Sequence, residues 1–363
     1  MKKFVALLLA AVMMLSVVAV ASAEDMRVAM ITDYGDITDQ SFNQTTYEAG
    51  KAWCEANGVD FTYYKPAGDS SAERVAMVEK AVDEDYNVII MPGFAFADTI
   101  GEVQDEYPEV RMIAIDVDSS DLDHVAPNLY CCVYQEQYVG YLAGYSAVKL
   151  GYKHVGYLGG MAVPAVVRYG YGFVEGVNAA AEELGIADQV TLEYVYGNQF
   201  YGDADITAYM DNWYQNLGVE VVFACGGGIY TSAAEAAAKV GGKVIGVDVD
   251  QSGVIDGLYG EGITLSSAMK GLAGSVNSML NAIKDGIFDE NYGGKAENLG
   301  ITSPDPALNA VQLSETTQFA DGFTKDDYNA MVAAMYNGEI TVSNDFSAIP
   351  ATTITLNELG TVK

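Results

Sequence analysis

The stretch VGYLGGM, residues 155–161, starts a second series of strands and helices, and this repetition decides the fold. It joins an apolar run to a glycine turn, which is typical of a strand covered on both faces. Similar apolar runs lie at 27–31, 88–91, 112–115, 221–224 and 244–247. Segments of helical period lie between them, at 43–56, 72–83, 137–149, 171–184 and 232–239. Alternation at this spacing predicts an α/β fold with parallel, doubly wound sheets.

The series runs once to about residue 149 and restarts near His154, so we expect two α/β lobes of similar build. No Pro/Ser-rich linker separates the two series, and short crossovers are therefore expected to join the lobes. Ligands of open α/β sheets bind outside the carboxyl ends of the strands. Two such lobes facing each other predict a cleft that is lined from both sides.

Composition limits the possible partners. The chain has 50 acidic and 18 basic residues among 363, and its net charge is −32. Such a surface repels phosphate backbones, which excludes nucleic-acid binding. Half of the residues are hydrophobic and 19% are charged, as in a compact globular protein. We expect a monomer with a small-molecule ligand.

The N-terminus has the pattern of a cleaved export signal. Two lysines precede an apolar run at 4–20, and Ala-Ser-Ala at 21–23 offers a small-x-small cleavage site. A membrane anchor is the alternative, but the run is short for a span of about 20 residues. We expect an extracytoplasmic protein in the periplasm or cell-envelope space. The first cysteine is Cys54, so no lipobox cysteine is expected at the cleavage site.

Few residues suggest cofactor or catalytic chemistry. The four cysteines (Cys54, Cys131, Cys132 and Cys225) have no disulfide-framework spacing, and we expect them to be buried and apolar in role. The two histidines stand in no metal motif, so neither a metal nor a cofactor is predicted. No nucleophile motif is present, and an enzyme would have to rest on carboxylates alone.

Carboxylates and aromatic rings follow several predicted strands. The motifs are TDYGDITDQSFNQ (32–44), IDVD (115–118), GNQFYGD (197–203), CGGG (225–228) and GVDVDQ (246–251). Each taken alone fits a solvated turn or helix cap, and Ser41 is expected to cap the helix that starts near Phe42. Together they suit a hydroxylated, partly flat ligand, since carboxylates accept bonds from sugar hydroxyls and rings stack on a base.

Further motifs are GFAFAD (93–98), GYLAGYSA (140–147), VRYGYGFVEGV (167–177), SSAMK (266–270) and GEIT (338–341). Together with the motifs above, they resemble the Bmp/Med family of basic membrane lipoproteins, which includes PnrA-like purine nucleoside receptors. The resemblance runs from about 27 to 345. It implies a type I periplasmic-binding-protein fold whose two Rossmann-like lobes are joined by a hinge of three crossovers. It also implies a signal peptide at 1–23, a first lobe at 24–149 plus 267–290, and a second lobe at 150–266 plus 291–363.

The family further implies a purine nucleoside held between two rings and delivered to an ABC transporter permease. Carried over by motif, Phe42 and Phe200 would stack on the base, with Tyr201 as the alternative to Phe200. Asn43 and Asp116 would contact base edges. The ribose side would fall to Asp248 and Lys270, with Asp33, Gly226 and Gly227 close by.

Departures from the family pattern also occur. Thr38 and Gln40 replace an acid and a lysine, and Val249 replaces an arginine. A sugar or another small hydroxylated ligand, or a role as a ligand sensor, stays open as an alternative.

Overall fold

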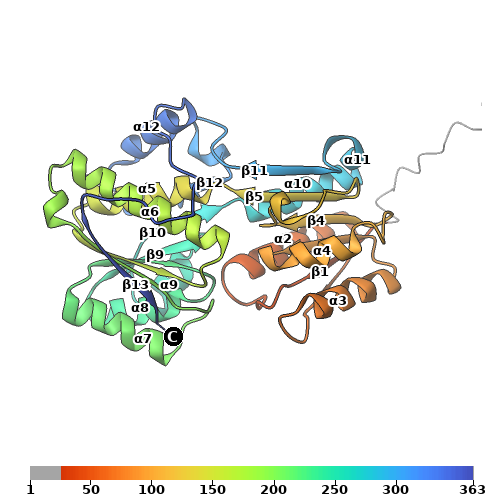
Figure 1. Cartoon of the computed structure of the whole chain (residues 1–363), viewed down its shortest axis with the longest axis horizontal. Helices are drawn as coiled ribbons and strands as arrows, with labels where there is room; N and C mark the ends of the chain where they lie inside the picture. The colour runs from red at the N-terminus through yellow and green to blue at the C-terminus, as the bar shows by residue number, and fades with distance from the viewer. Residues whose placement is uncertain (1–25, 363) are drawn as a thin grey trace, which may run out of the picture.

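The computed structural model describes residues 26–362, which form two α/β lobes, each built on one sheet (Figure 1). The first sheet has six parallel strands in the order β11-β5-β4-β3-β1-β2. They are β1 (Arg27–Ile31), β2 (Asp60–Tyr64), β3 (Val88–Pro92), β4 (Arg111–Ile115), β5 (Leu129–Tyr134) and β11 (Lys295–Leu299). Helices α2 (Phe42–Asn57) and α10 (Leu272–Lys284) pack on one face, and α3 (Ser71–Asp83) and α4 (Ala97–Val103) pack on the other. The short α11 (Phe288–Asn291) leads into β11.

The second sheet repeats this order and adds a strand at its edge, as β12-β10-β9-β8-β6-β7-β13. Its strands are β6 (His154–Gly159), β7 (Thr191–Tyr196), β8 (Val221–Cys225), β9 (Lys243–Asp248), β10 (Thr264–Lys270), β12 (Val311–Leu313) and β13 (Thr355–Thr361). All pairs are parallel except β10 with β12. One face carries α5 (Glu136–Lys149), α6 (Pro164–Glu183) and α12 (Lys325–Tyr336). The other carries α7 (Ala204–Asp211), its π-helical continuation Asn212–Leu217, α8 (Tyr230–Ala238) and α9 (Ser252–Tyr259).

The predicted fold class is confirmed. All six apolar runs quoted above form strands, and each lobe is a sheet with helices on both faces. Corresponding strands hold corresponding places in the two sheets, so β4 of the first sheet matches β9 of the second. The carboxyl ends of β4 and β9 therefore meet across the space between the lobes, where the predicted site residues follow them.

Glycines let α5 and α6 pack unusually closely. A Cβ added at Gly140 would lie 2.2 Å from the Tyr169 carbonyl oxygen, and one at Gly172 would lie 2.1 Å from that of Gln137. Distances this short mean that the two helix backbones touch, which only glycine permits. The contact brings the first turn of α5, which carries Glu136, beside the second turn of α6, which carries Arg168.

The chain crosses between the sheets three times, after β5, after β10 and between β11 and β12. Three segments differ from the expected boundaries. Helix α5 packs on α6 of the second lobe, residues 267–270 are the end of β10 in the second sheet, and β11 pairs with β5 of the first. The expected boundary at 149 followed the end of a helix, whereas the chain leaves the first sheet at the end of β5. We propose lobe boundaries near residues 135, 271 and 300.

All four cysteines are buried and free of disulfides, as expected. Within residues 26–362 no helix is long and apolar enough to cross a membrane. The expected export signal and its cleavage site lie outside the described residues.

Candidate ligand-binding cleft

A cavity of about 650 Å³ lies between the carboxyl ends of the two sheets. Both lobes contribute to its wall, as the sequence predicted. All ten predicted site residues line it: Asp33, Phe42, Asn43, Asp116, Phe200, Tyr201, Gly226, Gly227, Asp248 and Lys270. Their individual roles toward a ligand stay predictions.

The first turn of α2 delivers Phe42 and Asn43 to the cavity. The helix begins at Phe42, as expected, but Ser41 does not cap it. Asp39 does so instead, because its carboxylate accepts hydrogen bonds from the backbone N–H groups of Ser41, Asn43 and Gln44 at 2.9–3.0 Å. Ser41 is thereby free to reach across the cleft, where its hydroxyl donates to Asp248 Oδ2 at 2.6 Å.

Asp33 shapes the loop after β1. One of its oxygens, Oδ1, accepts hydrogen bonds from the backbone N–H groups of Tyr34 and Gly35, both at 2.6 Å. Burial raises the pKa of Asp33, although these two bonds oppose the change. Gly93 passes close to the same side chain, since a Cβ there would lie 2.8 Å from Asp33 Oδ2. Asp33 thus holds the loop that carries Tyr34 into the cleft.

The glycine turn after β8 makes room for the ring of Phe200. Gly226 has φ 154° and Gly227 has φ 51°, and a Cβ at Gly226 would lie 3.0 Å from Phe200 Cδ1. The turn therefore serves close packing, and it opens α8 as expected. Phe200 also stacks on Tyr34 of the first lobe, with ring centroids 6.3 Å apart. Tyr201 is 63% exposed, so Phe200 is the ring that faces inward.

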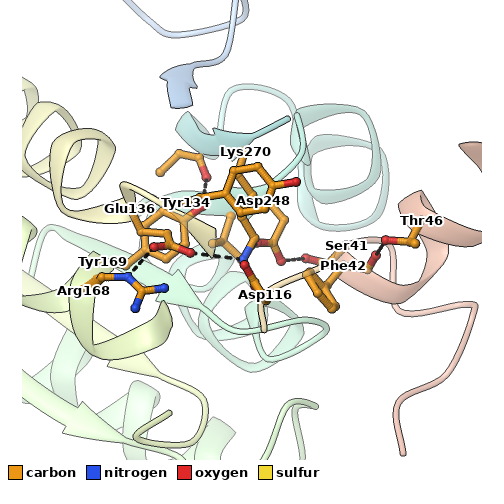
Figure 2. Close-up of polar contacts among 12 residues, drawn as sticks. Ser41, Phe42, Thr46, Asp116, Tyr134, Glu136, Arg168, Tyr169, Asp248 and Lys270 are labelled. Atoms are coloured by element: carbon orange, nitrogen blue, oxygen red, sulfur yellow. Dashed lines mark hydrogen bonds and ion pairs between the residues drawn. The ribbon is translucent and has the colours of Figure 1, made fainter. Parts of the chain in front are cut away.

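Lys270 lies at the centre of a buried ion network, which consists of Asp116, Glu136, Arg168, Asp248 and Lys270 (Figure 2). Its Nζ pairs directly with Asp116 Oδ2 and lies 3.6 Å from Glu136 Oε1 and 3.7 Å from Asp248 Oδ1. Burial alone would lower the pKa of Lys270, but the three carboxylates hold it above its usual value. The same nitrogen lies 4.8 Å from the centre of the Phe42 ring.

Glu136 and Arg168 are members of the network that sequence reasoning missed. Glu136 is fully buried, and its Oε2 accepts a 2.6 Å hydrogen bond from Arg168 Nε. Burial raises the pKa of Glu136, against the opposing effect of Arg168 and Lys270. The glycines of GYLAGYSA and VRYGYGFVEGV were the available signal, because they let the first turn of α5 pack beside the second turn of α6.

Asp116 and Asp248 share an uncommon backbone conformation. They have φ angles of 59° and 67°, in the left-handed region that non-glycine residues rarely adopt. Strain of this kind costs about 1–3 kcal/mol per residue and gathers at functional sites. Both residues follow corresponding strands of the two sheets and both pair with Lys270. This backbone conformation directs both carboxylates toward Lys270.

Two buried acceptors in the cavity wall hydrogen-bond to nothing in the described chain. They are Asn43 Oδ1 and Asp116 Oδ1. A buried acceptor without a partner costs about 1–3 kcal/mol, so such atoms normally have one. In a cavity wall, these acceptors suit N–H or O–H groups of a ligand.

Aspartates dominate the charge of the cavity. Seven aspartates line it (Asp33, Asp36, Asp39, Asp116, Asp118, Asp121 and Asp248), against three cations (Lys65, Arg168 and Lys270). No group of side chains within the described residues is arranged to hold a metal ion. This charge balance disfavours phosphorylated ligands and suits neutral ones with donor groups.

The sequence model of the Bmp family, described as ABC transporter substrate-binding protein PnrA-like, matches residues 26–337. The chain therefore belongs to this family of ABC transporter solute-binding proteins. A CD4+ T-cell-stimulating antigen of Listeria monocytogenes is similar, at 29% identity over 84% of both chains. So is the ABC transporter nucleoside-binding protein BmpA of Lactococcus lactis, at 25% identity over 73% of this chain and 76% of that protein. Several other relatives are named lipoproteins.

Solved structures confirm the fold. A solute-binding protein of an ABC transporter system from Aeropyrum pernix superimposes with a TM-score of 0.68 at 23% identity, and 88% of each chain is covered. One from Conexibacter woesei superimposes with a TM-score of 0.66 at 20% identity, covering 88% of this chain and 99% of that one. The two-lobed fold is thus shared with these solute-binding proteins.

Proposed function

We propose that this protein binds a purine nucleoside in the interlobe cleft and delivers it to the permease of an ABC importer. The proposal rests on one observation: an aromatic ring and two hydrogen-bond acceptors without partners line the same cavity. Phe42 offers a face for a base, while the neighbouring Asn43 and the facing Asp116 each hold an unpartnered acceptor. A nucleoside has a flat base with N–H groups and a ribose with hydroxyls, and it matches both features.

The aromatic clamp would come from both lobes. Phe42 belongs to α2 of the first lobe, and Phe200 follows β7 of the second. Both line the same cavity, which at about 650 Å³ is within the usual range for small-molecule sites. Asp248 and Lys270 would serve the ribose. The name of the Lactococcus relative supports this ligand class.

Closure of the lobes would complete the site. Ser41 bonds to Asp248 across the cleft, and Gln251 Nε2 donates to the Gln40 carbonyl oxygen at 3.1 Å. Each bond joins the first lobe to the second, and each would break if the lobes separated. We propose a monomer that opens and closes at its three crossovers, as binding proteins with hinges do. Export to the extracytoplasmic space, expected from residues 1–23, would place it beside its permease.

A ligand panel tests the proposal. Inosine, guanosine and adenosine should raise the melting temperature, since a ligand that binds only the native state stabilises it by mass action. Free ribose, arabinose and glucose should leave it unchanged. Native mass spectrometry of freshly purified protein should show a co-purified nucleoside. If a free sugar shifts the melt and no nucleoside does, the protein is a sugar-binding protein instead.

A further inference from the structure

Arg168 is a buried cation whose hydrogen-bonding capacity is mostly unused. It is only 7% exposed and lines the cavity. Its Nε donates to Glu136, while Nη1 and Nη2 hydrogen-bond to no other residue between 26 and 362. A guanidinium has five N–H donors, so four of them await acceptors. Neither nitrogen is among the buried atoms without a partner, and Arg168 lines the cavity, so an acceptor on a ligand there could reach them.

The orientation of the guanidinium is fixed from two sides. Glu136 holds its Nε edge, as Figure 2 shows, and Glu136 is in turn fixed by Lys270. The ring of Phe346 lies against the guanidinium, 5.8 Å from Arg168 Cζ. Phe346 belongs to the C-terminal segment beyond residue 337, where the match to the family model ends. A planar fork held in this way is preorganised, so it loses little conformational entropy when it binds.

Asp116 supplies a hydrogen-bond acceptor to the wall of the same cavity. Asp116 Oδ1 has no hydrogen-bond partner, and its other oxygen is ion-paired with Lys270. Asp116 and Arg168 belong to one ion network, because Lys270 pairs with Asp116 and lies 3.6 Å from Glu136, which accepts the hydrogen bond from Arg168. Donors at Arg168 and an acceptor at Asp116 thus line the same cavity, at the two ends of this network.

We propose that Arg168 and Asp116 together select 6-oxopurine nucleosides over 6-aminopurine nucleosides, with Arg168 as a further ligand-contacting residue. This inference rests on the proposed function. Inosine and guanosine present a carbonyl oxygen at position 6 and an N–H at position 1, which match donors at Arg168 and an acceptor at Asp116. Adenosine presents an amino group and a bare nitrogen at those positions, the reverse pattern. Arginine also donates to guanine O6 in nucleic acids, where its second hydrogen bond goes to N7.

The first test uses the unmodified protein and calorimetric titration. Inosine and guanosine should bind about ten- to a hundredfold more tightly than adenosine. 1-Methylinosine, which lacks the N–H, should fall toward adenosine. Equal affinities for inosine and adenosine, or tighter adenosine binding, would overturn the inference while leaving nucleoside binding intact. If no nucleoside binds, the proposed function fails with it.

The second test uses Arg168→Gln and Arg168→Lys, with Arg111→Gln as the matched control. Arg111 pairs with Asp289 on the outside of the first lobe and does not line the cavity. Both Arg168 variants should weaken inosine binding at least about tenfold and leave adenosine binding nearly unchanged. The control should change neither. Equal weakening for both nucleosides would assign Arg168 to the ribose or to structure and overturn the inference. Thermal melts identify a variant that fails to fold, in which case the ligand series on the unmodified protein decides.

Discussion

Asp116 and Asp248 occupy corresponding places in the two lobes, yet their partners differ. Each follows the strand beside the crossover strand of its sheet, each has a positive φ, and each pairs with Lys270. Asp248 Oδ2 also accepts the Ser41 hydroxyl from the other lobe, whereas Asp116 Oδ1 accepts nothing. The repeated fold therefore supplies two corresponding carboxylates. Each contacts the other lobe, Asp248 through Ser41 and Asp116 through Lys270, but only Asp116 keeps a buried oxygen without a partner.

Removing their shared cation should have the largest effect. Lys270→Met leaves three buried carboxylates without their central partner. Breaking a buried ion pair from one side costs about 3–5 kcal/mol, so the free energy of unfolding should fall by that amount and nucleoside binding should be lost. Denaturant titration and calorimetry measure the two effects. Lys325→Met is the control, because Lys325 pairs with Glu315 at an exposed position and does not line the cavity. A Lys270→Met variant as stable as the control would contradict the network.

The two carboxylates can be compared directly by Asp116→Asn and Asp248→Asn. Asp116→Asn should weaken nucleoside binding by about ten- to a hundredfold, since hydrogen bonds to charged groups contribute about 1.5–3 kcal/mol. Asp248→Asn should cost less affinity, because Ser41 and Lys270 already partner its two oxygens, whereas Asp116 Oδ1 has no partner in the described chain. If Asp248→Asn costs as much affinity as Asp116→Asn or more, the division of roles is wrong.

The rings that each lobe contributes offer a third comparison. Stacking is worth about 1–3 kcal/mol per base, so Phe42→Ala and Phe200→Ala should each weaken binding by about ten- to a hundredfold. Tyr201→Ala, at an exposed position, should have little effect in the same calorimetric titration.

Melting curves of the same variants separate the clamp from the core. A variant that keeps its affinity but melts early would place that ring in the core, where truncation costs about 3–5 kcal/mol of stability. Loss of binding in Tyr201→Ala but not in Phe200→Ala would shift the clamp by one residue.

The smallest effect is expected at the hydrogen bond between Ser41 and Asp248, which joins the two lobes. Ser41→Ala removes the hydroxyl that reaches Asp248, which is worth about 0.5–1.5 kcal/mol. Affinity should fall by about two- to tenfold, with a larger radius of gyration without ligand. Ser278→Ala, on the exposed face of α10, should match the unmodified protein. An unchanged radius and affinity in Ser41→Ala would mean that this bond does not hold the lobes together.

Much of the fold could be predicted from the sequence, because strands buried on both faces are continuous apolar runs. Strands β2 (DFTYY) and β10 (TLSSAMK) do not have this pattern, because polar and aromatic residues interrupt their apolar residues. The crossovers were also harder to predict. The break between β5 and α5 has no linker composition, and the membership of α5 depends on glycine contacts with α6 that no local pattern reveals.

The candidate site could be predicted where its residues follow strands. Asp33, Asp116 and Asp248 stand at strand ends, and the family motifs supplied the two phenylalanines and Lys270. Glu136 and Arg168 could not be predicted in this way, since both sit in helices and meet only through tertiary packing. The cap of α2 was assigned to Ser41 because serine at that position usually caps, but Asp39 competes for the same N–H groups.

A crystal structure of the protein grown with inosine tests the central claim most directly. The account predicts that the base lies between Phe42 and Phe200, and that an N–H of the ligand approaches Asp116 Oδ1 to about 2.7–3.2 Å. The Ser41 to Asp248 bond should persist across the closed cleft. A ligand bound elsewhere, or a base that leaves both rings and Asp116 Oδ1 without contact, would contradict it.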